Sequence, residues 1–233
     1  MKIIEWEKLP QDMQTEQVRP YYEALKKRKG SLFLKRAFDL VAGVAGLLVL
    51  SPVFLVLAIL IKLDSPGPVF FRQERVTQYG KHFRIFKFRS MVNNADKIGT
   101  QVTVGNDSRI TRTGKLIRKC RLDELCQLID VFRGTMTFVG TRPEVPKYVA
   151  AYTPEMQATL LLPAGVTSLA SIMYKDEDQL LDGAEDVDAT YTQQVLPDKM
   201  RYNLEAIEKF SFWGDIKLMF MTVFAVLGKD YSK

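Results

Sequence analysis

The clearest hydrophobic pattern in this chain is an uncharged segment of 22 residues from Leu40 to Ile61. As one continuous helix it would be about 33 Å long, which is enough to span the hydrocarbon core of a bilayer. Thirty-nine residues precede the segment, and a large domain follows it without an evident small-residue cleavage site. The pattern therefore predicts a membrane helix and not a secretory signal.

Two features of this segment argue against a simple transmembrane helix. Ser51-Pro52 lies in its middle, where proline removes a backbone donor and clashes with the preceding turn. Basic residues flank both ends, and positive charge favours the cytoplasmic side for each flank. Two alternatives follow: a helix that enters, breaks at Ser51-Pro52 and returns within one leaflet, or a transmembrane helix kinked by its proline. The flanking basic residues are Lys26, Lys27, Arg28, Lys29, Lys35, Arg36, Lys62, Arg72 and Arg75.

Alternating residues after the apolar segment predict a β-hairpin. Val69–Val76 is rich in β-branched and aromatic residues, Tyr79-Gly80-Lys81 is typical of a turn, and His82–Arg89 alternates as a second strand. This hairpin would hold its basic side chains near the lipid headgroups, where they would contact lipid or bind substrate phosphate. Those side chains are Arg72, Arg75, Lys81, Lys87 and Arg89.

Helical periodicity predicts two further elements. Thr113 would cap a helix from about Lys115 to Phe132, and Gly134 suits its end. Its expected buried stripe consists of Leu116, Ile117, Cys120, Leu125, Leu128, Ile129 and Phe132. The segment Phe210–Leu227 is a second amphipathic helix, which would lie in the membrane interface or in a soluble core.

Charge is distributed unevenly along the 233 residues. The chain as a whole carries +6, but residues 62–121 hold 14 Lys and Arg against 4 Asp and Glu, a net charge of +10. Residues 122–233 hold 10 against 17, a net charge of −7. A local basic region of this kind fits phosphate ligands, anionic lipid or nucleic acid. With 47% hydrophobic and 26% charged residues, the composition excludes a disordered chain.

Cysteine and histidine usage excludes several site types. Cys120 and Cys126 have the spacing of neither a redox pair nor a zinc site, and they indicate a reducing compartment. His82 is the single histidine, which gives little support to a Ser-His-Asp triad or a histidine-rich metal site. The candidate chemistry lies instead at Asp123 and Glu124, two adjacent carboxylates preceded by Arg118, Lys119 and Arg121.

These neighbouring cations suit the two carboxylates to phosphate chemistry. Cations lower the pKa of a nearby carboxylate and keep it ionised. An ionised Asp123 could attack phosphorus to form an acyl-phosphate, and Glu124 could hold Mg²⁺. An Asp-Glu pair on a helix is by itself usually a surface feature, so its context has to carry the assignment.

From about Leu34 to Leu227 the chain resembles the bacterial sugar transferases, the monotopic polyprenyl-phosphate phosphoglycosyl transferases. No single block is decisive, but their order after this membrane segment is specific. The matching blocks are Lys35-Arg36-Ala-Phe-Asp39, Ser51-Pro52, Gly67-Pro-Val-Phe-Phe-Arg-Gln-Glu-Arg75, Gly80-Lys81 with Phe83, Phe86-Lys-Phe-Arg-Ser-Met91, Arg121-Leu-Asp-Glu-Leu125 with Gln127-Leu128, Gly140-Thr-Arg-Pro-Glu144, and Phe212-Trp213 with Asp215.

The resemblance implies an activity and its residues. Such enzymes transfer a sugar-1-phosphate from a UDP-sugar to polyprenyl (undecaprenyl) phosphate, release UMP, and begin the membrane assembly of a bacterial glycoconjugate such as exopolysaccharide. Asp123 would be the nucleophile that carries the phospho-sugar, and Asp123 and Glu124 would bind Mg²⁺. The expected phosphate and nucleotide contacts are Arg75, Lys87, Arg89, Arg118, Lys119, Arg121 and Arg142.

The resemblance also implies the architecture. We expect an α+β, mainly helical monotopic membrane protein with a re-entrant helix hairpin broken at its proline, a small β-hairpin and amphipathic interfacial helices. Residues 1–31 would be a polar and basic extension, 32–63 the re-entrant helix, and 64–233 a catalytic domain on the cytoplasmic face of the bacterial inner membrane. Membrane lipid would be a partner, and a homo-oligomer is compatible with the sequence.

Departures from the family pattern leave the dyad intact but weaken predictions about the sugar and nucleotide pocket. Thr141 and Cys126 replace frequent prolines, Thr135 replaces an acid, and Ser168-Leu169 replaces Gly-Trp. One alternative is a UDP-sugar glycosyltransferase with Asp176 and Asp178 as its metal ligands. Another is a non-enzymatic protein, either a membrane scaffold or a nucleic-acid binder, that uses the basic region. We expect no nucleic-acid partner, because aromatic stacking residues do not accompany the basic ones.

Overall fold

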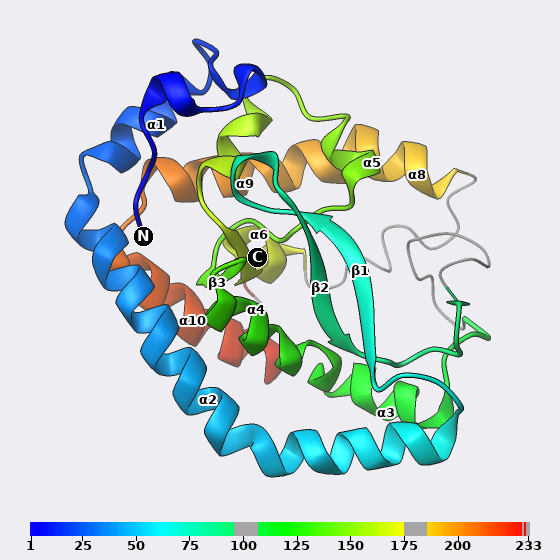
Figure 1. The fold of residues 1–233 in the computed structure, drawn as a ribbon. Coiled ribbons are helices and arrows are strands. Elements are labelled where there is room, and N and C mark those ends of the chain that lie inside the picture. Colours follow the sequence, from blue (N-terminus) through cyan, green and yellow to red (C-terminus); the bar gives the residue numbers. More distant parts are fainter. Residues whose placement is uncertain (96–106, 175–185, 230, 232–233) are drawn as a thin grey trace.

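Helices dominate the protein, and two separate two-stranded sheets lie between them in the part of the chain that the structure describes (Figure 1). The computed structural model describes residues 1–95, 107–174, 186–229 and 231. Its elements are η1 (Trp6–Lys8), η2 (Gln11–Met13), α1 (Arg19–Lys26), α2 (Lys29–Asp64), β1 (Phe70–Val76), η3 (Gln78–Gly80), β2 (His82–Phe88), α3 (Arg112–Lys119), η5 (Leu122–Gln127), α4 (Leu128–Arg133), β3 (Met136–Val139), α5 (Pro146–Val149), η6 (Met156–Leu161), β4 (Ala164–Thr167), α6 (Leu169–Met173), α8 (Val187–Thr190), the π-helix η7 (Tyr191–Val195), α9 (Leu196–Glu208) and α10 (Phe212–Val226).

Helix α2 contains the uncharged segment and changes direction along its length (Figure 1). Pro52 lies inside it, and the Ser51 hydroxyl donates to the carbonyl of Leu48 at 2.8 Å. The helix remains continuous across Pro52, so the proline produces a bend instead of an interruption. Among the described residues, α2 is the one helix that is both long and apolar enough to span a bilayer, with a mean hydropathy of 2.9 over an 18-residue window. Exposed side chains such as Val49 and Leu63 fit membrane association.

Two buried polar residues anchor the first half of α2. The Lys35 ammonium donates to the carbonyl of Val139 and to Asp215 Oδ2, both at 2.6 Å. The Asp39 carboxylate accepts from the Thr137 hydroxyl at 2.7 Å. Both residues are almost fully buried, and charged groups are rarely buried unless they are paired. These contacts fix α2 to α10 and to β3.

The end of α2 is fixed to the hairpin and to α3. Arg89, directly after β2, donates to the carbonyls of Ser65 at 2.6 Å and Pro66 at 3.0 Å. Asp64, the last residue of α2, accepts from the backbone N–H of Thr113 at 2.8 Å. Helix α3 therefore starts against the end of the apolar helix.

The predicted β-hairpin is confirmed. Strands β1 and β2 pair antiparallel with Gln73 opposite Ile85, and Tyr79 and Gly80 form the turn with positive φ angles of 59° and 70°. The alternation places Lys87 toward η5 and the dyad, where its ammonium reaches Glu124.

A parallel pair, β3 with β4, fixes the loop that follows β3. Gly140 donates its N–H to the carbonyl of Thr167 at 2.9 Å, and Gly165 donates to that of Thr141 at 2.8 Å. The backbones approach so closely that a Cβ added to Gly165 would lie 2.2 Å from backbone atoms of Gly140. The loop from Gly140 to Glu144 is thus held by a contact that only glycine permits.

The prediction of one helix from Lys115 to Phe132 is wrong. Helix α3 is capped by Thr111, whose hydroxyl accepts from Gly114 N–H at 3.0 Å, and not by Thr113. It ends at Lys119, and Arg121 adopts a left-handed conformation with φ 54°. The chain then continues as η5 and α4, and Gly134 ends α4 with φ 82°, as expected.

The break at Arg121 changes which side chains are buried. Ile117 is buried as predicted, but Leu116 and Phe132 are 58% and 48% exposed, and Cys120 is exposed as well. The left-handed conformation of Arg121 rotates η5 and α4 relative to α3. One buried stripe therefore does not run through residues 115–132.

The N-terminal segment packs into the core that contains residues far along the chain. Met13, Tyr22 and Leu25 are buried in one cluster with Leu161 and Leu204. In Figure 1 this segment, in dark blue, lies beside the start of α2 and near α9. Residues 1–28 and the residues that follow α2 are consequently parts of one folded unit.

Helix α10 confirms the helix predicted at Phe210–Leu227. None of its residues is buried, and Trp213 and Phe220 are 75% and 62% exposed. An apolar helix with such exposure fits the membrane interface better than a soluble core.

Candidate active site

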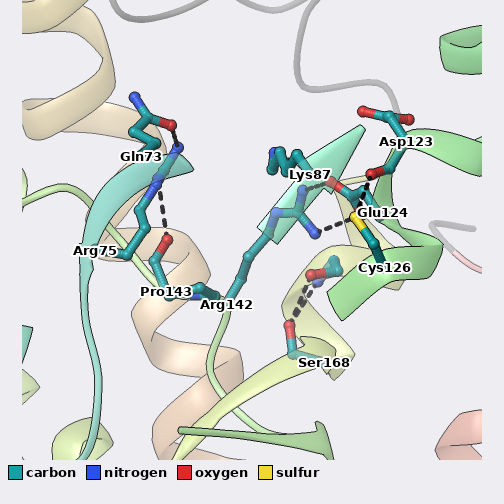
Figure 2. Close-up of polar contacts among 10 residues, drawn as sticks. Gln73, Arg75, Lys87, Asp123, Glu124, Cys126, Arg142, Pro143 and Ser168 are labelled. Carbon is teal, nitrogen blue, oxygen red and sulfur yellow. Dashed lines mark hydrogen bonds and ion pairs between the residues drawn. The ribbon is translucent and has the colours of Figure 1, made fainter. Parts of the chain in front are cut away.

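The break after α3 positions the two candidate carboxylates. Because Arg121 turns the chain, Asp123 and Glu124 occupy the first turn of the 3-10 helix η5. Figure 2 shows that their side chains diverge: Glu124 points toward Lys87 and Arg142, whereas the carboxylate of Asp123 points away from them. The dyad thus presents one carboxylate to protein cations and leaves the other, which is half-buried, without a side-chain partner among the described residues.

Glu124 is held by two basic side chains from distant elements. Arg142 Nη1 donates to Glu124 Oε2 at 3.1 Å, and Nη2 donates to Oε1 (Figure 2). Lys87 Nζ lies 3.4 Å from Oε1. Burial opposes ionisation of this carboxyl, but Arg142 and Lys87 outweigh it and hold the pKa of Glu124 well below its usual range. Glu124 is therefore a fixed anion.

Asp123 has the opposite electrostatic environment. Burial and the neighbouring Glu124 charge raise its pKa, while Lys87 and Arg118 oppose that rise. No side chain of another described residue lies within hydrogen-bond distance of its carboxylate; Cys126 Sγ donates to its backbone carbonyl at 3.5 Å (Figure 2). The pKa of Glu124 is lowered as expected, but mainly by Arg142 and Lys87 and not by the cations that precede it in the sequence. Arg118 does oppose the rise at Asp123, but burial and Glu124 outweigh it. A half-buried carboxylate without a side-chain partner among the described residues suits a nucleophile.

Arg75 and Lys87 add positive charge on the Glu124 side of the dyad. Arg75 donates to the carbonyl of Pro143 at 3.0 Å and to Gln73 Oε1 at 2.7 Å (Figure 2). Burial lowers the pKa of Lys87 despite the opposing charge of Glu124, and it lowers the pKa of Arg75 despite Glu144. The predicted residues Arg75, Lys87, Glu124 and Arg142 therefore converge in the fold.

The other predicted contacts lie elsewhere around the site. Arg118 is in the last turn of α3, close enough to influence Asp123, while Lys119 and Arg121 are exposed near the break. Arg89 caps the end of α2, and none of its described contacts involves the dyad. Asp176 and Asp178, the metal ligands of the alternative glycosyltransferase, lie outside the described residues.

Two buried polar features were not assigned by sequence reasoning. Gln127 is 1% exposed, and neither its amide nitrogen nor its amide oxygen has a protein partner. Behind Arg142, Glu144 accepts a hydrogen bond from Tyr191. Both Gln127 and Glu144 belong to the motifs that the resemblance uses, but a motif does not show burial or long-range partners.

The donor chemistry of the dyad fits Mg²⁺ bound jointly with a substrate. Mg²⁺ is usually held by one or two carboxylates together with water and phosphate oxygens. No cluster of three or more His, Cys, Asp or Glu side chains suited to a metal occurs among the described residues. A carboxylate has about four lone-pair sites, and the contacts of Glu124 to Arg142 and Lys87 occupy three of them. The open Asp123 carboxylate and the remaining site on Glu124 suit a shared ion, not a closed metal cage.

Comparisons with known proteins cover most of the chain. The family model described as bacterial sugar transferase matches residues 30–229. A UDP-N-acetylgalactosamine-undecaprenyl-phosphate N-acetylgalactosaminephosphotransferase of Aeromonas hydrophila is 36% identical over 198 residues, which are 84% of this chain and 44% of that protein. A UDP-glucose:undecaprenyl-phosphate glucose-1-phosphate transferase of Escherichia coli K12 is 39% identical over 196 residues, which are 82% of this chain and 39% of that protein.

A third relative has a length similar to that of this chain. The exopolysaccharide production protein PSS of Rhizobium leguminosarum bv. phaseoli is 37% identical over 209 residues, which cover 86% of this chain and 99% of that protein. The chain therefore spans less than half of the first two relatives and almost all of the third.

Proposed function

Because the chain belongs to the bacterial sugar transferase family, we propose that it is a phosphoglycosyl transferase that moves a sugar-1-phosphate from a UDP-sugar to polyprenyl phosphate. The names of its relatives, which describe sugar phosphotransferases acting on undecaprenyl phosphate, support the substrate classes. The observation that carries the proposal is the divided dyad. Glu124 is locked by Arg142 and Lys87, and beside it the Asp123 carboxylate is left open.

The first step uses Asp123 as the nucleophile. A carboxylate oxygen of Asp123 attacks the phosphorus that bears the sugar, the bond from that phosphorus to the bridging oxygen breaks, and UMP leaves with the electron pair. Lys87, Arg142 and Arg75 supply positive charge where the diphosphate oxygens would lie. Fixed charges of this kind act in a site that is partly shielded from water, where they are most effective.

The second step returns Asp123 to its starting state. An oxygen of polyprenyl phosphate attacks the phosphorus of the acyl-phosphate, the bond to Asp123 breaks, and the carboxylate is released together with polyprenyl-diphosphate-sugar. No net proton transfer is required. Asp123 and Glu124 would hold Mg²⁺, which offsets the charge of the diphosphate when it is bound. A covalent intermediate lets a soluble donor and a lipid acceptor use one site in turn.

Contacts on both sides of α2 support the proposed membrane arrangement of this helix. Residues before α2, such as Tyr22 and Leu25, share a core with Leu204, which follows it. Arg28, just before α2, donates to the carbonyl of Phe210 at 2.5 Å. A helix whose two flanks belong to one folded unit cannot place them on opposite sides of a bilayer. The bend in α2 then supports a re-entrant helix, with the catalytic part on the cytoplasmic face of the inner membrane.

Product analysis tests the proposed reaction. The protein in nanodiscs is incubated with Mg²⁺, undecaprenyl phosphate and each of several UDP-sugars, and the released nucleotide is identified. We expect UMP, and intact-mass spectrometry without acceptor should show a phospho-sugar adduct on the protein. Asp123→Asn should abolish both, while the exposed control Asp12→Asn should retain them. Release of UDP would point instead to a glycosyltransferase, and full turnover by Asp123→Asn would exclude the nucleophile.

A further inference from the structure

Three buried polar side chains contact one another beside the loop that carries Arg142. Lys199 Nζ donates to the Tyr191 hydroxyl at 3.0 Å, and that hydroxyl donates to Glu144 Oε1 at 2.6 Å. Lys199 Nζ also lies 3.6 Å from the same Glu144 oxygen. All three residues are less than 10% exposed. Buried charges of this kind persist only where they are paired, so the cluster fixes the Glu144 side chain firmly.

The backbone around Glu144 is held from the opposite side by β1. Val76, the last residue of β1, donates its N–H to the carbonyl of Glu144 at 3.0 Å. Arg75 donates to the carbonyl of Pro143 at 3.0 Å. The segment from Arg142 to Glu144 is therefore clamped between β1 and the helical segment of residues 187–208, and Arg142 extends from this clamp to Glu124.

An irregularity in the helical segment brings Tyr191 and Lys199 to one face. They are eight residues apart, which in a regular α-helix leaves side chains about 80° apart around the axis. Tyr191 opens the π-helix η7, and Lys199 lies in the following α9. A π-helical turn contains one additional residue, so a separation of eight acts approximately as a separation of seven, about 20° apart. Such π-turns often occur at functional sites.

We propose that Tyr191 and Lys199 are positioning residues for the transfer reaction and that they act through Glu144 on Arg142, and so on Glu124. This inference rests on the proposed function, since it assigns a catalytic consequence to the clamp. A cluster that served stability alone would have no need of buried charge, because apolar side chains of similar volume are often equally or more stable there.

Hydrogen–deuterium exchange of the full-length protein tests the clamp without requiring turnover. Tyr191→Phe removes only the hydroxyl that links Lys199 to Glu144. Tyr148→Phe is the matched control, because its ring stacks on Tyr191 at 4.6 Å while its hydroxyl donates to Asp188 instead. We expect Tyr191→Phe to speed exchange in residues 140–146 and at Val76 by about tenfold, and Tyr148→Phe to leave both unchanged. Equal changes in the two variants, or none in either, would overturn the clamp.

Turnover in two backgrounds then tests the catalytic consequence. UMP release from radiolabelled donor is measured for Tyr191→Phe alone and in combination with Arg142→Ala. We expect Tyr191→Phe to lower kcat by about tenfold with Arg142 present and by less than about twofold without it, because residues that act through one another are not additive. The same loss in both backgrounds would show that Tyr191 does not act through Arg142. If the wild type released no UMP, the proposed function would fail while the exchange result on the clamp remained interpretable.

Discussion

Arg142 donates hydrogen bonds from both terminal guanidinium nitrogens to the carboxylate of Glu124, which is 18 residues away in the sequence. The pairing joins the loop after β3 to the first turn of η5. A planar guanidinium that meets a carboxylate through two parallel hydrogen bonds fixes the orientation of both groups. It also holds Glu124 as an anion by lowering its pKa, and so contributes to the difference between the two carboxylates.

Arg142→Lys should reduce kcat/KM for the UDP-sugar roughly 10- to 100-fold, because an ammonium cannot reproduce the paired hydrogen bonds. Thermal unfolding in nanodiscs should change little, since a cation remains beside Glu124. Arg201→Lys is the control: Arg201 forms an exposed ion pair with Asp198 on α9, and its replacement should leave the rate unaltered. An Arg142→Lys protein as active as the wild type would show that the paired geometry is unnecessary.

The pH dependence of the rate should report Asp123. Its pKa is raised by burial and by Glu124, and the positive charge of Arg118 opposes this rise. The reaction needs the ionised form, so kcat/KM falls as the pH drops through this pKa. Removing the charge with Arg118→Met raises the pKa further, and the acid limb of the profile should move to higher pH. Lys115→Met, an exposed residue of the same helix, should leave the limb in place.

Two results for the pH profile would contradict this assignment. A limb that moved to lower pH in Arg118→Met, or that moved equally in Lys115→Met, would mean that the titrating group is not Asp123 or that Arg118 does not act on it. Measuring kcat separately would show whether the limb persists once the donor is bound.

Local patterns predicted the elements that depend on local chemistry. The hairpin of β1 and β2 was predicted from alternation and turn residues, and Gly134 from its capping preference. The break at Arg121 was not predictable, because arginine has no preference for positive φ and the periodicity of residues 115–132 fits one helix. The surrounding fold imposes this conformation, which places the dyad on a short 3-10 helix.

The family motifs named Lys87, Glu124 and Arg142 as site residues, but they did not predict how these residues pair. Nothing in the composition or periodicity links Lys87 and Arg142 to Glu124, and the burial of Lys199 beside Glu144 carries no local signal. Arg89 shows the reverse case: it was predicted at the substrate from its place beside Lys87, but its described hydrogen bonds cap the end of α2. A basic residue in β2 and another just after its end thus serve unrelated roles.

Gly165→Ala should both destabilise the protein and abolish its activity. The added methyl would lie 2.2 Å from the backbone of Gly140, so β4 must move away from the loop that carries Arg142. Overpacking of this kind typically costs about 1–3 kcal/mol. Gly30→Ala is the control, because no atom lies within 4 Å of its added Cβ and alanine favours a helix. Chemical unfolding in mixed micelles and UMP release would be compared, and a fully active, stable Gly165→Ala would contradict the close approach.

The Lys35–Asp215 pair should show strong coupling. Removing one partner leaves a buried charge uncompensated, so Lys35→Met and Asp215→Leu should each destabilise by about 3–5 kcal/mol. The double variant should lose much less than the sum, since no charge is left unpaired. The exposed pair Lys8–Glu5 offers a control cycle, for which the coupling should be below about 1 kcal/mol. Additive losses at Lys35 and Asp215 would mean that the pair does not contribute as a unit.

Labelling from each side of the membrane should place both flanks of α2 on the cytoplasmic face. Cys120 is exposed and Cys126 is buried, so a membrane-impermeant maleimide reports residue 120 in the native sequence. In a Cys120→Ser background, Gln11→Cys reports the segment before α2 from an exposed position. We expect both sites to react in inside-out vesicles and neither to react in intact cells.

The reason lies in the core that both flanks share. For Gln11 to reach the opposite face, Met13, Tyr22 and Leu25 would have to leave their cluster with Leu161 and Leu204. Exposing each such side chain costs roughly 1.5–3 kcal/mol, whereas the bend at Pro52 lets α2 return without that loss. Reaction of Gln11→Cys from outside, with Cys120 still reacting only from inside, would mean that α2 crosses the bilayer and that the N-terminal segment is not docked in the membrane-bound protein.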